Sequence, residues 1–363
     1  MAFPSPVGGT FLFIDFIPSI LFAGLYALLI PLIIYRAYDR TSRTTLLIGT
    51  VIFVIGHTVI YSLRAAAAHA GRTPGGLLTY IQADFTLGYV GISFDLVNLL
   101  RCLLVNSTFG SETQHQSPEI AARLSSRRYE PQYERLPEGA PDYPQRRFWI
   151  RRTCNFLTLG LFAATVPGLI STGHYSSDIR DPASADYIGR LRYASAGVTL
   201  LLTLVILGMT IWARALPRVN VRAAKLLSVL SSLICVIAIY RLSIMESTED
   251  SLDSTAPGSQ NRPIEKIMFY LFHVLPEWLV SFAFLGFNLR QMVGSGFFGD
   301  RRWNDETAEE RAKREAKDEI RLVQRTKRTA QRQAKGRPVP VFTEYIPLDS
   351  LETIPVYAPY SHH

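Results

Sequence analysis

Seven long apolar blocks constrain this chain more than any other feature of its sequence. A helix needs about 20 mostly apolar residues to cross a hydrocarbon core of roughly 30 Å. Blocks of that length, separated by polar connections, predict an all-α bundle of seven transmembrane helices. The blocks lie at about 11–35, 44–68, 78–105, 148–172, 191–213, 223–245 and 267–290.

Basic residues are distributed unequally between the two sides of such a bundle. Of the 38 lysines and arginines, 29 fall in the first, third and fifth connections and the tail, counted together with the adjoining ends of the blocks, and seven fall on the other side. Cytosolic connections carry the excess of basic residues in membrane proteins. The sequence therefore predicts an extracellular N-terminus (1–10), a seven-span membrane domain (11–292) and a cytosolic tail (293–363). It leaves open whether the membrane is the plasma membrane or an internal one.

The first block is interpreted as a retained span rather than a secretory signal. The preceding stretch, MAFPSPVGGT, contains no lysine or arginine, and no small-residue cleavage site precedes the next basic cluster. A secretory signal peptide normally shows both features.

Two polar segments are expected on the cytosolic side. The connection 107–147 is rich in proline and charge and poor in aliphatic residues, which predicts a disordered loop. The tail shows a helical pattern over about 305–335, where Thr307 and Glu310 fit a capping box. Its basic half is expected either to bind the anionic cytosolic leaflet or to act as a solvated anchor. A cytosolic signalling partner for these segments stays open.

Several ionisable residues fall inside or next to the blocks, mainly in the outer half. Such residues usually face a bundle interior or a water-filled cavity. Tyr270, His273 and Glu277 are spaced three and four apart, which places them on one helical face. Pro276 lacks a backbone N–H and is expected to act as a hinge there. The candidate site residues are Arg64, Asp84, Arg241, Glu246, Glu265, Tyr270, His273 and Glu277.

These residues predict a polar outer cavity in which Glu277 pairs with Arg241 or Arg64. The alternative is a structural pair that fixes the register of the helices without any ligand. Arg101, at the inner end of the third block, is interpreted as a residue whose long side chain reaches the interface.

Other function classes lack the residues that they need. Apart from Lys225 at the very start of the sixth block, no lysine lies within the seven blocks, and the last block has none, which argues against a retinal protein. Only His57 and His273 are histidines inside blocks, whereas a zinc site needs three or four ligands. We therefore expect no metal, no cofactor and no enzymatic activity. The basic residues are not interleaved with aromatic ones on a compact domain, so no nucleic-acid partner is expected.

Residues 240–311 resemble a known family. The stretch from YRLSIME to FYLFHVLPEW is similar to the last two spans of the fungal aminocholesterol-resistance, or lipid-translocating exporter, family. His273 departs from the pattern, since the family usually has an acid there. GFFGDRRWNDE also looks similar to a group of uncharacterised fungal seven-span proteins. The matching positions are Tyr240, Arg241, Glu246, Glu265, Phe269 and Tyr270.

The resemblance implies a fungal protein that transports or handles lipid-like, amphipathic molecules through the outer cavity, with membrane lipids as partners. In that case Arg241 would engage an anionic group. The alternative is a seven-span receptor that signals through its basic cytosolic loops and tail.

Overall fold

The computed structural model divides the chain into two units, Met1–Asp305 and Glu306–His363. The first unit holds all the long helices. Most of the basic helix expected at about 305–335, and the middle of the 107–147 loop, lie outside the described residues. The structure describes residues 3–119, 136–173, 182–252 and 254–302, together with positions 304, 305, 307, 309, 312, 313, 316 and 320.

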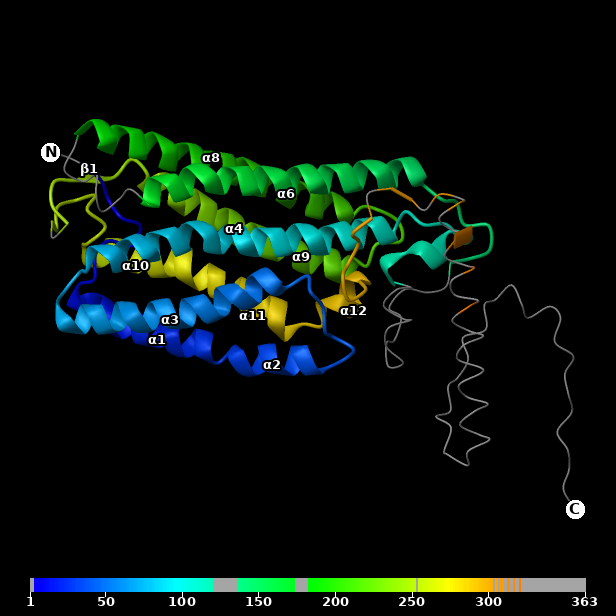
Figure 1. Ribbon diagram of the computed structural model, residues 1–363, viewed down its shortest axis with the longest axis horizontal. Helices are drawn as coiled ribbons and strands as arrows, with labels where there is room; N and C mark the ends of the chain where they lie inside the picture. The colour runs from blue at the N-terminus through cyan, green and yellow to red at the C-terminus, as the bar shows by residue number, and fades with distance from the viewer. Residues whose placement is uncertain are drawn as a thin grey trace, which may run out of the picture. The chain divides into compact units, whose positions relative to one another are not determined.

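Seven helical spans run side by side along one axis (Figure 1). All seven are long and apolar enough to cross a membrane, so the prediction of an all-α seven-helix bundle is confirmed and the protein is a multi-pass integral membrane protein. The spans are α1–α2 (Phe16–Ala27 and Ile30–Tyr38), α3 (Ile48–Ala70), α4 (Gly75–Asn106), α6 (Pro144–Gly173), α8 (Pro182–Ala213), α9 (Val221–Ile244) and α10–α11 (Pro263–Phe269 and Leu275–Gly286).

The first and last spans are interrupted. Pro31 stands at the start of α2, where its missing N–H leaves no intrahelical bond unmade. In the last span a single π-helical turn, Tyr270–Val274, joins α10 to α11 and ends two residues before Pro276. Such π turns are rare and often mark functional sites.

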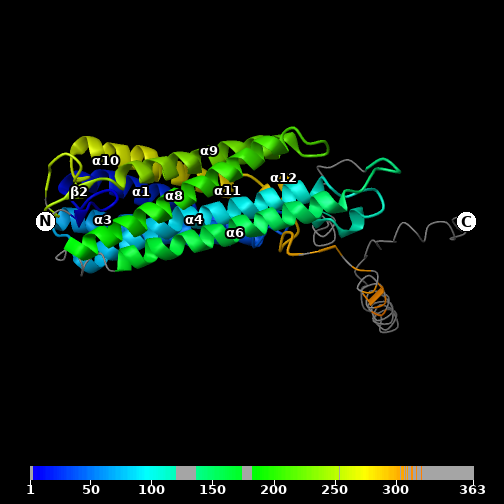
Figure 2. The same ribbon diagram turned by 90° about the horizontal axis from the view of Figure 1, so that it is seen from above.

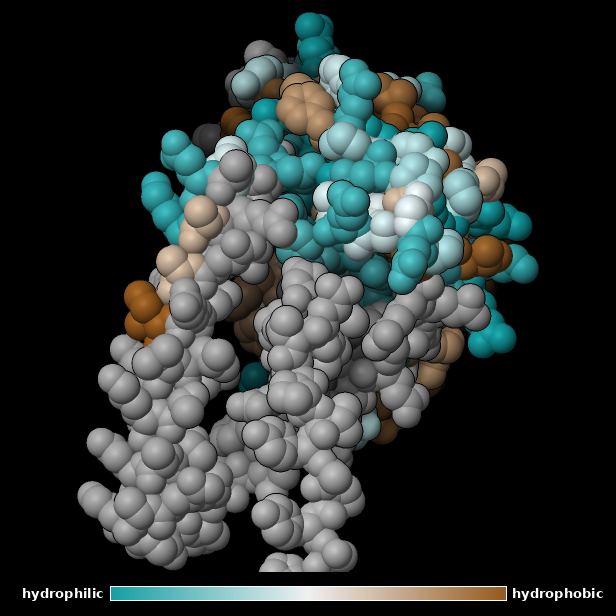
Figure 3. Space-filling view, turned by 90° about the vertical axis from the view of Figure 1, so that its right-hand side faces the viewer, coloured by the Kyte–Doolittle hydropathy of each residue, from teal (hydrophilic) through white to brown (hydrophobic). Residues whose placement is uncertain are grey.

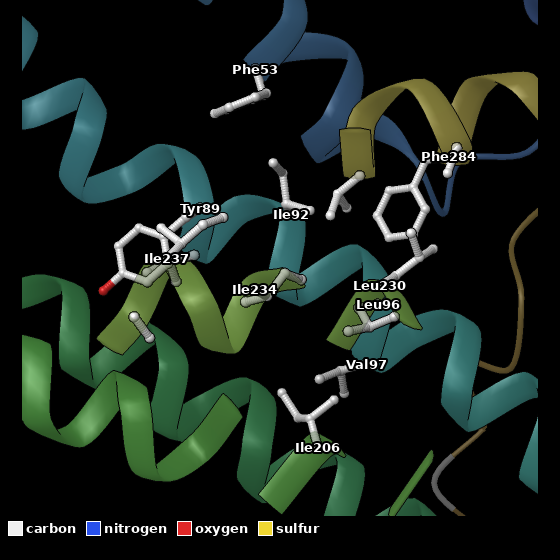
Figure 4. Packing of buried hydrophobic residues seen from close by; sticks show 14 of the residues in the cluster. Phe53, Tyr89, Ile92, Leu96, Val97, Ile206, Leu230, Ile234, Ile237 and Phe284 are labelled. Atoms are coloured by element: carbon white, nitrogen blue, oxygen red, sulfur yellow. The ribbon is translucent and has the colours of Figure 1, made fainter. Parts of the chain in front are cut away.

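Helix α4 lies at the centre of the bundle. In its most apolar stretch 83% of the residues are buried, compared with 22% in the first span. Figure 4 shows Tyr89, Ile92 and Leu96 of α4 in one core with side chains of α8, α9 and α11. Any helix that is to meet the bundle centre must therefore pack against α4.

The outer faces of the other helices carry large apolar side chains. Ile17, Ile52, Phe156 and Leu201 are between 62% and 75% exposed. A continuous apolar exterior of this kind is costly in water but matches hydrocarbon. The bundle therefore presents a surface suited to lipid.

The two ends of the bundle differ in construction. A two-stranded antiparallel ribbon, β1 (Phe3–Pro4) with β2 (Thr248–Glu249), closes one end, which we call the ribbon end. The opposite end carries α12 (Leu289–Val293) and is called the α12 end. Figure 2 shows the same separation from above.

The N-terminal segment folds back into the ribbon end. The side chain of Gln82 on α4 donates to the carbonyl of Val7 at 3.0 Å and accepts from its N–H at 2.9 Å. Gly8 has φ +72° and its Cα lies close to the ring of Phe269, where a Cβ would lie 2.8 Å from ring atoms. Both the conformation and the contact require glycine at this position.

A cluster of buried arginines holds the α12 end together. Asp300 accepts from Arg101 and from Arg151, each at 3.0 Å. Arg101 also donates to Asn155 at 2.6 Å. The interpretation of Arg101 as a snorkelling residue is therefore wrong, because the segment after α12 returns a carboxylate to it. Figure 3 views this end, where hydrophilic side chains gather among the coloured residues.

The 107–147 connection is ordered at both of its ends, contrary to the expectation of a disordered loop. The N–H of Tyr143 donates to the carbonyl of Thr108 at 2.9 Å. Arg147 forms ion pairs with Asp142 at 2.8 Å and Asp305 at 2.6 Å. Burial disfavours ionisation of these two carboxyls, but the hydrogen bonds from Arg147 outweigh it and hold the pKa of each below its ordinary value. Residues 120–135 lie outside the described part of the chain.

Replacing Asp300 by asparagine should destabilise the α12 end. Arg101 would stay buried without a carboxylate, and Arg151 would keep only its pair with Asp305. Breaking a buried pair costs about 3 kcal/mol or more. Denaturant unfolding in detergent, followed by tryptophan fluorescence, measures the change. The matched control is Asp186→Asn, whose pair with Arg190 is exposed. Equal unfolding midpoints for the two variants would contradict the role given to Asp300.

Candidate functional site

Buried ionisable side chains in the ribbon-end half form two groups. The first, the Asp15 cluster, consists of Asp15, Arg64, Lys266 and Tyr270. The second, the buried polar chain, consists of Asp84, His57, Glu277, His273 and Arg241. The groups share neighbouring helices but use different partners.

The Asp15 cluster ties the N-terminal segment to the last span. Asp15 pairs with Arg64 at 3.0 Å and with Lys266 at 2.7 Å, and accepts from the hydroxyl of Tyr270 at 3.1 Å. Both cations also donate to the carbonyl of Gly8, at 2.6 and 2.8 Å. Two cations thus share one carboxylate, and backbone carbonyls accept from both of them. Arg64 Nε and Nη1 have no hydrogen-bond partner, and the guanidinium lies over the rings of Phe11 and Phe269. This arrangement is a structural anchor.

Lys266 corrects the expectation that no lysine lies within the last span. The last span begins at Pro263 rather than 267, so Lys266 is inside it and buried. A signal for the earlier start was present in the sequence. Pro263 occupies the first turn, and Glu265 accepts from the N–H of Arg262 at 3.2 Å, which is a typical helix start.

The buried polar chain crosses the bundle through direct contacts. His57 Nδ1 lies 3.1 Å from Asp84 Oδ2, and its Nε2 lies 3.4 Å from Glu277 Oε2. The same Glu277 oxygen lies 3.3 Å from His273 Nδ1. His57, His273 and Glu277 have no exposed side-chain surface, whereas the side chain of Asp84 is 22% exposed. The chain therefore has one end at the surface of the bundle.

Arg241 closes the other end of the chain. Its guanidinium donates to the carbonyl of Phe85 and, at 3.2 Å, to the hydroxyl of Thr86, and stacks over the ring of Tyr89. Its NH1 lies 3.4 Å from His273 Nε2. Arginine carries donors only, so His273 Nε2 must be an acceptor and its proton must sit on Nδ1. We assign this tautomer from the hydrogen-bond partners.

His57 differs because it lies between two carboxylates. Its ring is packed among aromatic rings, with Phe53 at 3.7 Å and Tyr26 at 5.1 Å between centroids. If the chain holds one shared proton and it lies on His57, both carboxylates are ionised, both ring nitrogens are donors and His57 is a cation. If His57 is neutral, one carboxyl must hold the proton. With Arg241 positive, the chain has zero net charge in both states.

The predicted pairing of Glu277 with Arg241 or Arg64 is wrong. Arg64 pairs with Asp15, and His273 stands between Arg241 and Glu277. The sequence places a residue at a depth in its own span, but it does not state which helices are neighbours. His57 on α3 is the partner that this reasoning left out, although its position inside an apolar block marked it.

The remaining candidate site residues do not join the buried polar chain and lie in different parts of the structure. Tyr270 belongs to the Asp15 cluster, so it does not join His273 and Glu277 although all three are on one span. Glu246 is exposed in the connection after α9. Glu265 caps α10 and lines a groove. The π turn that ends two residues before Pro276 agrees with a weakened helix there, and a hinge motion stays a prediction.

The groove lies between α9 and the α10 segment on the outer face of the bundle and has a volume of about 620 Å³. Tyr240 connects it to the buried polar chain, because its ring lies 6.1 Å from that of His273 and its hydroxyl lies 3.5 Å from Gln260 Oε1. The groove is lined by Val236, Ile239, Tyr240, Ser243, Ile244, Gln260, Ile264, Glu265, Met268 and Phe272.

Within the described residues, no group of three or more histidine, cysteine, aspartate or glutamate side chains is arranged to hold a metal ion. The members of the buried polar chain follow one another in a line, rather than surrounding a common point.

Comparison of the chain with protein-family models, curated proteins and solved structures found no match in any of the three. The function is therefore inferred from the geometry of the chain itself.

A double-mutant cycle tests the His57–Glu277 contact. His57→Gln and Glu277→Gln should each lower the free energy of unfolding, and the double variant should lose less than the sum by about 1–2 kcal/mol, because contacting residues couple. Denaturant unfolding in detergent supplies the values. The control cycle pairs Glu277→Gln with Arg64→Gln, which should be additive within about 0.5 kcal/mol. Coupling in the control and additivity in the test pair would reverse our assignment.

Proposed function

We propose that the protein transports an amphipathic, lipid-like molecule that binds in the groove between α9 and α10. The observation that carries the proposal is the groove itself, which combines apolar walls with a polar end on a membrane-facing surface. Ligand sites in proteins typically measure about 300–1,000 Å³ and have mostly apolar walls with a few placed polar groups. The volume of about 620 Å³ lies in this range.

The groove is open toward the lipid-facing exterior. Ile239 and Ile264 on its two walls are 53% and 51% exposed, and they continue the apolar surface of the neighbouring helices. A molecule dissolved in the hydrocarbon could enter sideways without crossing water. This access favours an apolar body over a soluble polar substrate.

The polar end of the groove favours a head group that donates hydrogen bonds. Glu265 stands at that end with Gln260 and Ser243. The carboxylate already accepts from the N–H groups of Gly258 and Arg262. An ionised carboxylate has about four acceptor positions, so it can accept further bonds from a hydroxyl or an amine.

Arg241 does not supply the anion site that the sequence suggested for it. Its donors face Phe85, Thr86 and His273 inside the bundle rather than the groove. With a carboxylate at the polar end, a head group that is itself anionic would be repelled. The proposal therefore concerns neutral or cationic amphipathic molecules.

Two further features support this reading. The resemblance of residues 240–311 to lipid-translocating exporters covers the α10 wall of the groove and Tyr240, Ser243 and Ile244 of the α9 wall. The excess of basic residues on the side of the tail supports an orientation with the ribbon end, and hence the polar end of the groove, outside.

Photoreactive lipids test the binding site. Full-length protein in nanodiscs should be labelled on α9 and α10 by photoreactive cholesterol or by a photoreactive long-chain amine, but not by a photoreactive fatty acid. Ile239→Trp should fill the groove and lower labelling about tenfold, as expected for a loss near 1.4 kcal/mol. The control is Ile211→Trp on α8, which is 52% exposed on another outer face. Equal labelling in both variants, or by the fatty acid, would contradict the proposal.

Movement of the bound molecule between the two leaflets distinguishes a transporter from a receptor. In proteoliposomes, the bound probe should pass between leaflets faster with wild-type protein than with Ile239→Trp. Binding without any movement would contradict transport and would favour a seven-span receptor whose ligand enters the same groove.

A further inference from the structure

The buried polar chain has no role in holding the head group, yet it begins at the surface and ends beside the groove. We propose that His57 carries a proton between Asp84, at the bundle surface, and Glu277, in the bundle centre, and that protonation of Glu277 loosens the π turn beside the groove. The proton-transfer part stands by itself, and the link to the groove rests on the proposed function.

The contacts of His57 suit a proton carrier. Each ring nitrogen faces a different carboxylate, with Asp84 at 3.1 Å and Glu277 at 3.4 Å. Intramembrane series of acids and histidines form the proton relays of pumps and transporters. The distances exceed the 2.7–2.9 Å or so of charge-assisted hydrogen bonds, and neither ring nitrogen has a partner in hydrogen-bond geometry. Each pair must therefore shorten and reorient before transfer.

The transfer balances in two steps. In the first, the O–H bond of a protonated Asp84 breaks, its electron pair stays on the carboxylate, and an N–H bond forms at His57 Nδ1. In the second, the N–H bond at His57 Nε2 breaks and an O–H bond forms on Glu277. His57 is then neutral again. The net charge of the chain is zero in both steps, which avoids the cost of an uncompensated charge during transfer, and it is −1 before Asp84 takes up the proton.

Arg241 stops the proton at Glu277. Onward transfer would require His273 to release the proton on Nδ1 and gain one on Nε2. That nitrogen faces the donor-only guanidinium of Arg241 at 3.4 Å. His273 and Arg241 are therefore positioning residues. Glu277 is a proton-loading site at the end of the path rather than an intermediate carrier.

Other titratable groups face this path from the packed helices. Tyr26 of α1 and Tyr61 of α3 lie beside the His57 ring, at 5.1 and 5.6 Å between centroids. Asp84 comes from α4, and Glu277 and His273 come from the last span. Arg241 of α9 reaches Glu277 only through His273. Lys266 and Arg64 are engaged by Asp15 instead.

The π turn connects the proton to the groove. His273 is part of this turn, and Phe272 of the same turn lines the groove. His273 Nδ1 lies 3.3 Å from Glu277 Oε2, and an ionised carboxylate attracts an N–H group more strongly than a neutral carboxyl does. Protonation of Glu277 therefore weakens its hold on His273, next to a proline that already removes one backbone hydrogen bond from the helix.

Infrared spectroscopy of full-length protein in nanodiscs tests the transfer. After a rapid drop from neutral to acidic pH, wild type should gain a carbonyl band of a buried carboxylic acid, and Glu277→Gln should lack that band. His57→Phe and Asp84→Asn should form it roughly 100-fold more slowly, since a positioned proton-transfer group contributes about 10²- to 10⁴-fold. Asp186→Asn, an exposed carboxylate on α8, is the control and should match wild type.

The experiments distinguish failure of the proton transfer, of its link to the groove and of the proposed function. A missing band in wild type, or an unchanged rate in both His57→Phe and Asp84→Asn, would overturn the transfer. If Glu277→Gln does not fold, the partly exposed Asp84 still allows the rate test. Labelling by the photoreactive amine at neutral and acidic pH tests the link: it should change with pH in wild type and not in Asp84→Asn. If the infrared band behaves as expected but labelling does not depend on pH, only the link between Glu277 and the groove is overturned. If no labelling occurs at all, the result counts against the proposed function.

Discussion

Glu277 is a carboxylate with no exposed surface inside a membrane-spanning bundle, and the rest of the structure depends on how it is compensated. Its oxygen lies within 3.4 Å of two imidazoles from different helices, His57 of α3 and His273 of the π turn. An unpaired buried charge would cost several kcal/mol, so these helices must meet at this point. Arg241 extends the contact to α9 and, through its bonds to Phe85 and Thr86, to the central helix α4.

The same contacts explain why the groove and the buried charge lie side by side. The π turn that turns His273 toward Glu277 also places Phe272 on the outer face, opposite α9. Tyr240 stands between them, with its ring toward His273 and its hydroxyl toward Gln260 at the polar end. A change of charge in the centre is thus next to the wall of a site open to lipid. The proposed proton-linked movement of an amphipathic molecule rests on this arrangement.

The sequence predicts the spans well, because a length of apolar residues is a local property. It also marks His273 and Glu277 as unusual, because an ionisable residue in an apolar block is visible without any structure. Partners are a different matter. Glu277 meets His57 rather than an arginine, and Arg101 meets Asp300, which is 199 residues away. Such pairs depend on which helices are neighbours and where the chain returns after the last span, and one sequence does not specify either.

Local signals could have improved two of these expectations. Pro263 and Glu265 mark a helix start that brings Lys266 into the last span. The loop expected to be disordered over 107–147 contains Asp142, and Asp305 lies in the similarly polar segment after α12; both neutralise Arg147. Counting basic residues alone treated Arg147 and Arg151 as topology signals, whereas both join Arg101 in a buried cluster with acids from the loop and from beyond α12.

The tautomer of His273 tests the central claim most directly, because the whole chain of contacts from Asp84 to Arg241 depends on it. Nitrogen NMR of full-length protein with ¹⁵N-labelled histidine, in nanodiscs at neutral pH, reports which ring nitrogen carries the proton. The signal is assigned by its loss in His273→Asn. The structure predicts a proton on Nδ1 and a free lone pair on Nε2, held by Arg241. A proton on Nε2, or on both nitrogens, would contradict the arrangement around Glu277 and the proton path derived from it.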